Sequence, residues 1–126
     1  MNIEEKIGII GKKGEDIASA HLKKNGYFIV LRNYAKKFGE IDIIAIDKDK
    51  TLVFIEVKTI VADENNTEFI KPEDNMTRSK INKLIKICVE FANKNEDLIR
   101  EDSGWRIDLI AVEMKRNKTN GRVDDR

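Results

Sequence analysis

Apolar residues recur with a helical period in two stretches of the chain and gather into short runs elsewhere. The clearest helical pattern spans residues 76–94, where apolar positions follow i, i+3, i+4 and i+7 spacing along one face. This face consists of Ile81, Leu84, Ile85, Cys88, Phe91 and Ala92. A second helix is predicted near the amino terminus, and Gly11 and Gly14 are positions where it could be interrupted. The predicted elements, in order, are helix 4–25, strands 27–32, 40–46 and 51–58, helix 76–94 and strand 105–112.

This order, αβββαβ, predicts an α/β protein with a mixed central sheet flanked by helices. The last strand is apolar on both faces, so we expect it to lie inside the sheet or to be covered on both sides. Residues 59–75 are polar and predict a long loop. Residues 1–113 are expected to form one domain. Residues 114–126 are charged and lack an apolar pattern, which predicts a disordered tail.

The strands at 40–46 and 51–58 carry acidic residues where buried strands ordinarily have none. In an antiparallel hairpin, facing residues have numbers that add to a constant. If the turn consists of residues 48–50, the constant is 98 and Asp42 faces Glu56. The Cβ atoms of facing residues lie about 4.5–5.5 Å apart, so the two carboxylates would meet at the open end of the hairpin. Any odd-numbered turn keeps them on a common face of the sheet, whereas an even-numbered turn does not.

Two carboxylates at this separation repel each other unless one is protonated or a cation lies between them. The chain has one histidine and one cysteine, which excludes a zinc site built from these residue types. Oxygen ligands favour Mg²⁺ or Mn²⁺. Lys58, two residues after Glu56 on the same strand face, adds a positive charge beside the expected metal. Metal, carboxylates and ammonium together suit hydrolysis of a phosphodiester bond, in which the metal polarises a phosphoryl oxygen and generates hydroxide.

A structural ion pair between Glu56 and Lys58 is an alternative interpretation, because both side chains lie on one strand face. Asp42 argues against it, since a charge at the matching position of the partner strand has no part in such a pair. Buried charges without a role are rare. A charge cluster with a structural role alone is a third interpretation.

Several short motifs follow one another in an order that resembles one protein family. They are Gly14-Glu15, Gly26-Tyr27, Arg32-Asn33-Tyr34, Gly39-Glu40-Ile41-Asp42, Phe54-Ile55-Glu56-Val57-Lys58 and Arg106-Ile107-Asp108. Asp42, a hairpin and then Glu56-Val57-Lys58 resemble the PD-(D/E)XK signature of restriction-endonuclease-like nucleases. The full set resembles the YraN-like family of predicted endonucleases over roughly residues 8–113. Two positions depart from the pattern: Ile41 stands where the superfamily has proline, and Ile60 where the family often has a basic residue.

The resemblance implies a restriction-endonuclease-like fold, similar to archaeal Holliday-junction resolvases, and a metal-dependent endonuclease acting on DNA. Branched or recombination intermediates are candidate substrates. Asp42 and Glu56 would be ligands of Mg²⁺ or Mn²⁺, and the backbone carbonyl of Val57 would complete the shell. Lys58 would be the catalytic lysine, and Glu15 an additional acidic residue from the first helix. Because related resolvases are dimers, the resemblance also implies a homodimer.

Glu15 and Lys80 have a plainer interpretation beside the functional one, and Lys12 and Lys13 are further candidates. Glu15 lies on a stripe of small and apolar residues, but a glutamate just after Gly14 is also typical of a helix N-terminal turn. Lys12 and Lys13 are expected to contact phosphate near the site. Lys80 matches a lysine common in the Thr-X-X-Lys segment of the family, and is otherwise an ordinary solvated lysine.

Composition limits the remaining functions. The formal net charge is +1, so contact with DNA must use local patches and not an overall basic field. A single cysteine fits a reducing, cytoplasmic location. Neither a signal peptide nor an apolar run long enough to span a bilayer is recognisable, so no membrane partner is expected. The near-neutral charge supports a rival function, a non-catalytic nucleic-acid-binding or adaptor protein that retains the nuclease fold.

Overall fold

The computed structural model describes residues 2–62, 68–69, 76–116 and 123–125. The elements are α1 (Ile3–Lys24), β1 (Phe28–Lys36), β2 (Gly39–Ile46), β3 (Leu52–Ala62), β4 (Glu68–Phe69), α2 (Arg78–Lys94), the 3₁₀ helix η2 (Glu96–Leu98), β5 (Trp105–Arg116) and β6 (Val123–Asp125). The predicted α/β class and the αβββαβ order of the main elements are confirmed. The arrangement is consistent with a restriction-endonuclease-like core. Within the described chain, neither α1 nor α2 has the length and hydropathy of a bilayer-spanning helix.

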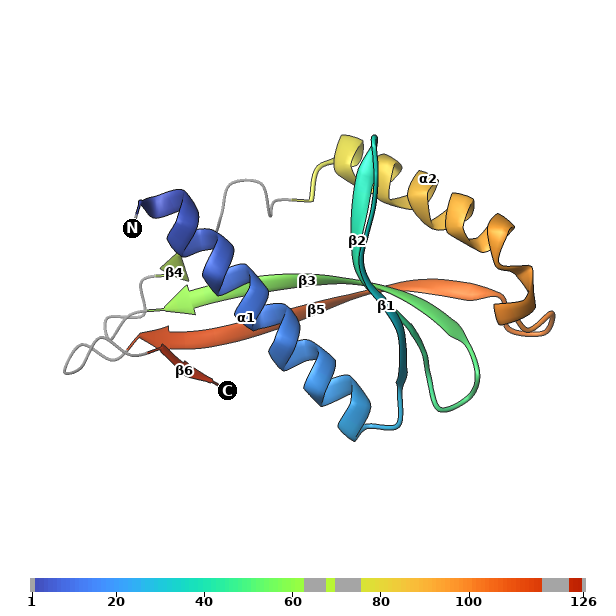
Figure 1. Ribbon diagram of the computed structural model, residues 1–126, viewed down its shortest axis with the longest axis horizontal. Helices are drawn as coiled ribbons and strands as arrows, with labels where there is room; N and C mark the ends of the chain where they lie inside the picture. Colours follow the sequence, from blue (N-terminus) through green and yellow to red (C-terminus); the bar gives the residue numbers. More distant parts are fainter. Residues whose placement is uncertain (1, 63–67, 70–75, 117–122, 126) are drawn as a thin grey trace.

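One mixed sheet joins the strands in the order β1-β2-β3-β5-β6, and β4 pairs with β3. β3 and β5 run parallel, and the other pairs of described strands are antiparallel. Figure 1 shows the β1–β2 hairpin turning steeply away from the β3–β5 pair, with α1 and α2 on different sides of the strands. Pairing between β2 and β3 is confined to residues 43–46 and 52–55, and beyond these residues the two strands separate.

The hairpin of β2 and β3 has the register that the sequence predicted, with facing residue numbers adding to 98. The pairs are Ile43 with Ile55, Ile44 with Phe54, Ala45 with Val53 and Ile46 with Leu52. The Asp47 N–H donates to the Thr51 carbonyl at 2.9 Å, which closes a three-residue turn. Lys50, the last turn residue, has a φ of 70°, as hairpins with three-residue turns require at this position.

Each face of the sheet carries its own hydrophobic core. The core on the α1 side consists of Ala18, Leu22, Ile43, Ala45, Val53, Ile55, Val61, Val112 and Met114. The core on the α2 side consists of Ile41, Ile44, Leu52, Phe54, Leu84, Ile87, Cys88, Phe91 and Ala92. Alternate residues of β3 thus enter opposite cores, as strand geometry requires. Continuing this alternation places Glu56 and Lys58 on the α2 side.

Arg106 holds the turn end of the hairpin. Its guanidinium donates to Asp47 at 2.7 Å and to Asp108 at 3.1 Å, and reaches the Tyr27 hydroxyl at 3.3 Å. Burial of Asp47 favours its neutral form, but hydrogen bonds from Arg106 and from the turn backbone hold the pKa of Asp47 below its usual value. The motif around Arg106 therefore has a structural role, at the end of the hairpin opposite Asp42.

The boundaries of α1 and β3 differ from those predicted. α1 runs unbroken through the glycines at 11 and 14, because packing against the sheet stabilises a helix that propensity alone would weaken. β3 continues to Ala62, so residues 59–62 of the predicted loop are strand. Three of these four residues, Ile60, Val61 and Ala62, are apolar, and the backbone of the segment is paired with β5. Residues 63–67 and 70–75 of the predicted loop lie outside the described residues.

The predicted tail, residues 114–126, is partly strand, and the last predicted strand is only partly covered. β5 continues to Arg116 and pairs there with β6, so residues 114–116 and 123–125 are strand and not disordered tail. Residues 117–122 and 126 lie outside the described residues. Strand 105–112 is also not covered throughout, since Leu109 is 58% exposed. The α2-side core reaches Trp105 and Ile107 and leaves Leu109 beyond it.

Candidate active site

Asp42 and Glu56 lie immediately beyond the last paired residues of β2 and β3. The last pair is Ile43 with Ile55, and the next pair in this register would be Asp42 with Glu56. The strands part at this point, and the Val57 backbone N–H donates to Asp42 Oδ2 at 2.7 Å. The Asp42 carboxylate thus accepts a backbone hydrogen bond at the point where pairing between β2 and β3 ends. The side chains of Asp42 and Glu56 both lie at the open end of the hairpin.

One oxygen of the Glu56 carboxyl group is enclosed without a partner. Oε1 is buried, and no described group forms a hydrogen bond with it. Burial, followed by the negative charge of Asp42, raises the pKa of Glu56 to about 8. Ionisation of Glu56 near neutral pH is therefore unfavourable unless a cation or donor compensates the charge.

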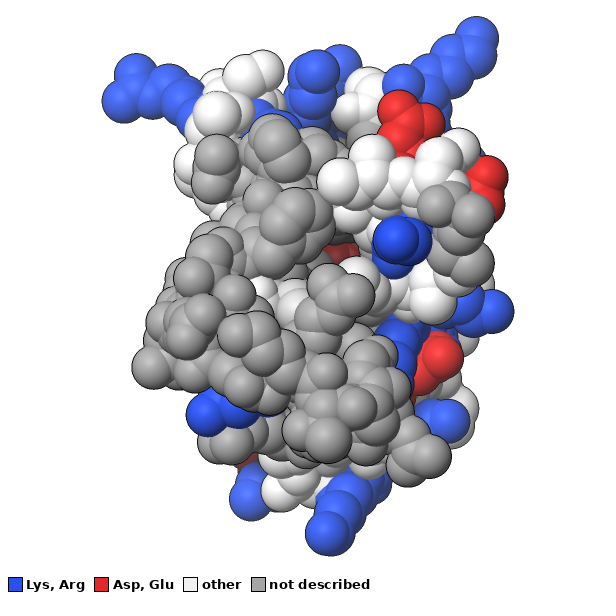
Figure 2. All heavy atoms as spheres, turned by 90° about the vertical axis from the view of Figure 1, so that its left-hand side faces the viewer, with Lys and Arg blue, Asp and Glu red and all other residues white. Residues whose placement is uncertain are grey.

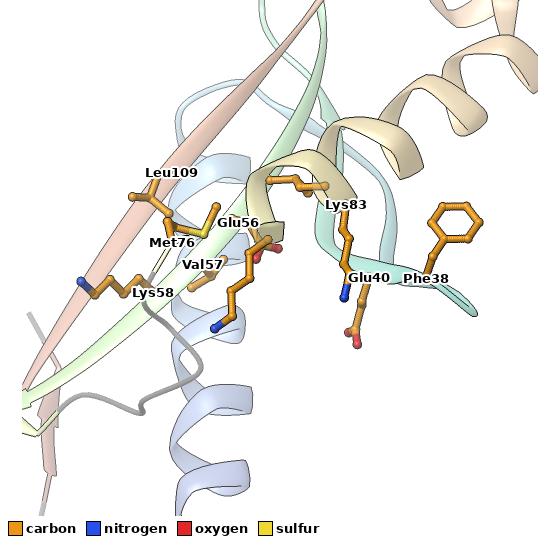
Figure 3. Close-up of a pocket in the computed structure, with 11 residues that line it drawn as sticks. Phe38, Glu40, Glu56, Val57, Lys58, Met76, Lys83 and Leu109 are labelled. Carbon is orange, nitrogen blue, oxygen red and sulfur yellow. The ribbon is translucent and has the colours of Figure 1, made fainter. Parts of the chain in front are cut away.

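A pocket of about 190 Å³ lies beside Glu56 on the α2 side of the sheet. It is lined by Phe38, Gly39, Glu40, Glu56, Val57, Lys58, Met76, Lys80, Lys83, Leu84 and Leu109. In Figure 3, Lys83 and Glu40 lie toward the β1–β2 hairpin, whereas Met76, Leu109 and Lys58 lie on the other side of Glu56, toward β5. Three lysines and two glutamates from β2, β3 and α2 therefore share one pocket.

Lys58 lines this pocket but does not pair with Glu56. Figure 3 shows the Lys58 side chain extending away from the Glu56 carboxyl group. None of the ion pairs between described residues joins them. The interpretation of these two residues as a structural ion pair is therefore wrong.

Glu15 approaches the site from the middle of α1. Gly14 is buried against β3, where a methyl group would collide with the Thr59 hydroxyl. The helix backbone therefore lies in close contact with β3, three residues beyond Glu56. The interpretation of Glu15 as a residue of a helix N-terminal turn is wrong, because α1 begins at Ile3.

The Glu15 carboxyl group lies in a crowded electrostatic environment. Burial, followed by the negative charge of Asp42, raises the pKa of Glu15, although the positive charge of Arg32 and a hydrogen bond from Asn33 oppose the shift. Arg32 lies 3.7 Å from Glu15 Oε1 and 2.8 Å from Asp16 Oδ1. Glu15 therefore adds to the negative potential around Asp42.

Asn33 and Glu40 extend this acidic network, although neither was predicted as a site residue. In the orientation that satisfies both neighbours, the Asn33 amide donates to Glu15 Oε1 at 2.9 Å and to Glu40 Oε1 at 3.0 Å. Burial and the charge of Asp42 raise the pKa of Glu40. The hairpin of β1 and β2 is the feature that could have indicated these residues. Its register pairs Arg32 with Ile43 and Tyr34 with Ile41, which brings Asn33 level with Asp42.

The predicted phosphate-binding lysines lie in different places. Lys80 lines the pocket beside Glu56, together with Lys83, which was not predicted although it lies one helical turn further along α2. Lys12 lines a second hollow, together with Glu15. Lys13 is exposed on α1 and is not among the residues that line either pocket.

Comparison with known proteins identifies the family that carries these motifs. The model of the uncharacterised protein family UPF0102 matches residues 14–112. The chain belongs to this family. It is the YraN-like family predicted from the motif order, and the matched segment runs from the middle of α1 into β5.

Several UPF0102 proteins from bacteria are similar to this chain over most of its length. The protein from Chloroherpeton thalassium is 42% identical over 118 residues, which cover 91% of this chain and 85% of the relative. The protein from Flavobacterium johnsoniae is 39% identical over 103 residues, 82% of this chain and 80% of the relative. The protein from Persephonella marina is 42% identical over 104 residues, 82% of this chain and 83% of the relative. These names specify no activity, so the chemistry must be argued from the site.

The donor set of this UPF0102 protein suits a hard divalent cation that keeps part of its water shell. Among the described residues, no three His, Cys, Asp or Glu side chains form a group arranged to hold a metal ion. Mg²⁺, however, is commonly bound by one or two carboxylates and retains several waters. Asp42 and Glu56 are the two carboxylates that would hold such an ion, with the Val57 carbonyl as the further ligand that the family resemblance implies. The partnerless Glu56 Oε1 is the observation that favours it.

Among the described residues on the face shown in Figure 2, basic side chains do not form one continuous patch. Lys and Arg side chains project mainly from the margins of this face, and acidic atoms lie at the bottom of a hollow near its centre. This distribution agrees with the net charge of +1.

Proposed function

We propose that this UPF0102 protein is a metal-dependent endonuclease that hydrolyses DNA phosphodiester bonds. The observation that carries the proposal is the buried, partnerless oxygen of Glu56 beside Asp42, in a pocket lined by three lysines. Asp42, Glu56 and the Val57 carbonyl would hold Mg²⁺ or Mn²⁺. When bound, the ion would polarise a phosphoryl oxygen and lower the pKa of a water molecule.

The residues around the carboxylates have complementary tasks in this proposal. Lys58 would turn toward the scissile phosphate and stabilise the charge that develops on its oxygens. Lys80 and Lys83 would contact neighbouring phosphates and fix the position of the strand. Glu15 would raise the affinity of Asp42 for a cation through added negative charge.

Cleavage of labelled DNA tests the proposal directly. Wild type, Glu56→Gln and a control, Glu96→Gln, are incubated with linear duplex, single-stranded and four-way-junction DNA in Mg²⁺, Mn²⁺ or EDTA. Glu96 is exposed in η2, away from the pocket. We expect metal-dependent cleavage that Glu56→Gln lowers by about 100-fold or more, while Glu96→Gln is unchanged. Absence of cleavage under conditions where Mn²⁺ is bound would overturn the proposal.

A non-catalytic nucleic-acid-binding protein is the second candidate, and one observation favours it. Asp42 Oδ2 already accepts the Val57 N–H, so this carboxylate also has a structural task at the end of the ladder. Calorimetric titration with Mn²⁺ separates the candidates, because the endonuclease should lose metal binding in Asp42→Asn and Glu56→Gln. If wild type shows no measurable Mn²⁺ binding, and if Asp42→Asn and Glu56→Gln bind DNA as tightly as wild type, the second candidate is favoured.

The expected homodimer and cytoplasmic location are further parts of the proposal. Light scattering over a range of protein concentrations tests the dimer. A monomer at every concentration, with cleavage retained, would remove the dimer from the proposal and leave the chemistry in place.

A further inference from the structure

Two large apolar side chains lie exposed in the pocket that contains the carboxylates. Met76 is 41% exposed and Leu109 is 58% exposed, and both line the pocket with Glu56. Leu109 of β5 is level with Glu56 of β3 in the parallel register, and Met76 directly precedes Thr77, the N-cap of α2. Figure 3 shows Met76 and Leu109 on the same side of Glu56. An apolar wall therefore adjoins the acidic centre.

The ligand of this pocket must suit both the cations and the apolar wall. Lys58, Lys80 and Lys83 line the pocket and match the negative charge of a phosphodiester backbone. The exposed apolar surface of Met76 and Leu109 offers neither charge nor a hydrogen bond to a phosphate, but it matches the apolar face of a nucleobase. In a regular duplex, base faces are stacked and unavailable. An unpaired nucleotide presents a phosphate and a free base face together.

We infer that the pocket binds an unpaired nucleotide next to the scissile phosphate, with its base against Leu109 and Met76 and its flanking phosphates on the three lysines. This inference rests on the proposed endonuclease function and names its substrate class, DNA with a single-stranded segment at the cleavage site. Duplex DNA without an unpaired nucleotide is a poor ligand, because its stacked bases leave the apolar wall exposed to water.

Binding measured without cleavage tests this inference. Wild type, Leu109→Ser, Met76→Ser and Ile85→Ser are titrated, with Ca²⁺ in place of Mg²⁺, against a single strand, the matching duplex and a duplex with one unpaired 2-aminopurine. Ile85 is the matched control, since it is 42% exposed on α2 but does not line the pocket. All three substituted side chains are exposed, so the variants are expected to fold.

Wild type should bind the single strand and the unpaired-nucleotide duplex about tenfold more tightly than the perfect duplex. Leu109→Ser and Met76→Ser should remove most of this preference and the change in 2-aminopurine fluorescence, and Ile85→Ser should not. Lys83→Met should weaken binding of all three DNAs alike and reduce the salt dependence by about one counterion. Equal affinity of wild type for all three DNAs, or an equal effect of Leu109→Ser on each, would overturn the inference.

Cleavage with Mn²⁺ in parallel distinguishes the inference from the proposed function. Selective binding without cleavage of any DNA would remove the nuclease and leave the unpaired-nucleotide site. Efficient cleavage of perfect duplex, unaffected by Leu109→Ser, would remove the site and leave the nuclease. A concentration-dependent dimer that Leu109→Ser dissociates would show that a second copy covers the wall, and would also overturn the inference.

Discussion

The backbone N–H of Val57 donates to Asp42 Oδ2 at 2.7 Å at the point where β2 and β3 separate. Asp42 therefore has two tasks that draw on different properties of its side chain. As a hydrogen-bond acceptor it completes the end of the ladder, for which a neutral oxygen suffices. As a negative charge it raises the pKa of Glu56, and this charge is what a cation would require.

Substitutions of Asp42 should separate these tasks. Asp42→Asn keeps an acceptor for the Val57 N–H and removes the repulsion of Glu56, so its free energy of unfolding in EDTA should equal or exceed that of wild type. Asp42→Ala leaves the N–H without its acceptor and should cost about 1–2 kcal/mol. Both variants should lose Mn²⁺ binding. Urea unfolding in EDTA, with calorimetric Mn²⁺ titration, measures these effects, and equal destabilisation by Asn and Ala would contradict the assigned hydrogen bond.

The raised pKa of Glu56 predicts a pH-dependent stability in EDTA. The pKa is about 8 in the folded protein against an ordinary value of 4.5, so within this window the folded protein holds a proton that the unfolded chain releases. The resulting stabilisation is fully present below pH 4.5 and is lost as the pH rises through about 8. In wild type, this decline in the free energy of unfolding should be on the order of 1 kcal/mol or more. We expect the decline to be smaller in Glu56→Gln.

Urea unfolding at several values between about pH 5 and pH 8.5 measures the decline. Mn²⁺ competes with the proton for Glu56, so its stabilising effect on wild type should grow over the same range. A decline of the same slope in Glu56→Gln would assign the pH dependence to other groups.

The hairpin could be predicted from the sequence because its constraints are local. Strand period and turn length together fix which residues face each other, so Asp42 and Glu56 were placed by counting. The closing Asp47–Thr51 hydrogen bond and the positive φ of Lys50 supply that turn length in the structure. Lys80 could be placed in the pocket only through the resemblance, since nothing in the helix pattern distinguishes it from other exposed lysines.

The remaining site residues depend on long-range geometry. Lys83 meets Glu56 because α2 packs against this end of the sheet, and Leu109 meets it through the parallel pairing of β3 and β5. No local pattern encodes either contact. Strand ends were underestimated for a similar reason: backbone pairing between β3 and β5 extends to Ala62 and Lys115, where side chains no longer alternate clearly. The exposure of Leu109 was missed because an apolar strand ordinarily indicates burial on both faces.

Two glycines of α1 provide a matched test of how the helix is seated. A methyl group at Gly14 would collide with the Thr59 hydroxyl, whereas nothing lies within 4 Å of the corresponding position at Gly8. Gly14→Ala should lower the free energy of unfolding by about 1–3 kcal/mol. Gly8→Ala should raise it by about 0.5–1 kcal/mol, because alanine has a higher helix propensity than glycine at an exposed position. Equal effects in urea unfolding would contradict the close packing of α1 on β3.

Asn33 offers a final test, because its backbone conformation and the hydrogen bonds of its side-chain amide can be changed separately. Its φ is 55°, and its amide links Glu15 and Glu40 at 2.9 and 3.0 Å. Asn33→Gly keeps the backbone conformation and loses the link, whereas Asn33→Ala adds strain of about 1–2 kcal/mol. Asn33→Asp replaces the donor with a third carboxylate, so it should be the least stable variant at neutral pH and recover as the pH falls.

Lys50→Gly is the control for the Asn33 series, since Lys50 also has a positive φ, of 70°, but lies in the turn at the other end of the hairpin. It should be neutral or slightly stabilising, by a few tenths of a kcal/mol, because glycine relieves the strain. Unfolding in EDTA ranks the variants, and Mn²⁺ affinity shows whether the link matters for the cation. If Asn33→Gly behaves like Lys50→Gly in both measurements, the amide does not hold Glu15 and Glu40 in place. A loss of Mn²⁺ affinity of about tenfold in Asn33→Gly alone would instead show that the network positions the carboxylates around Asp42.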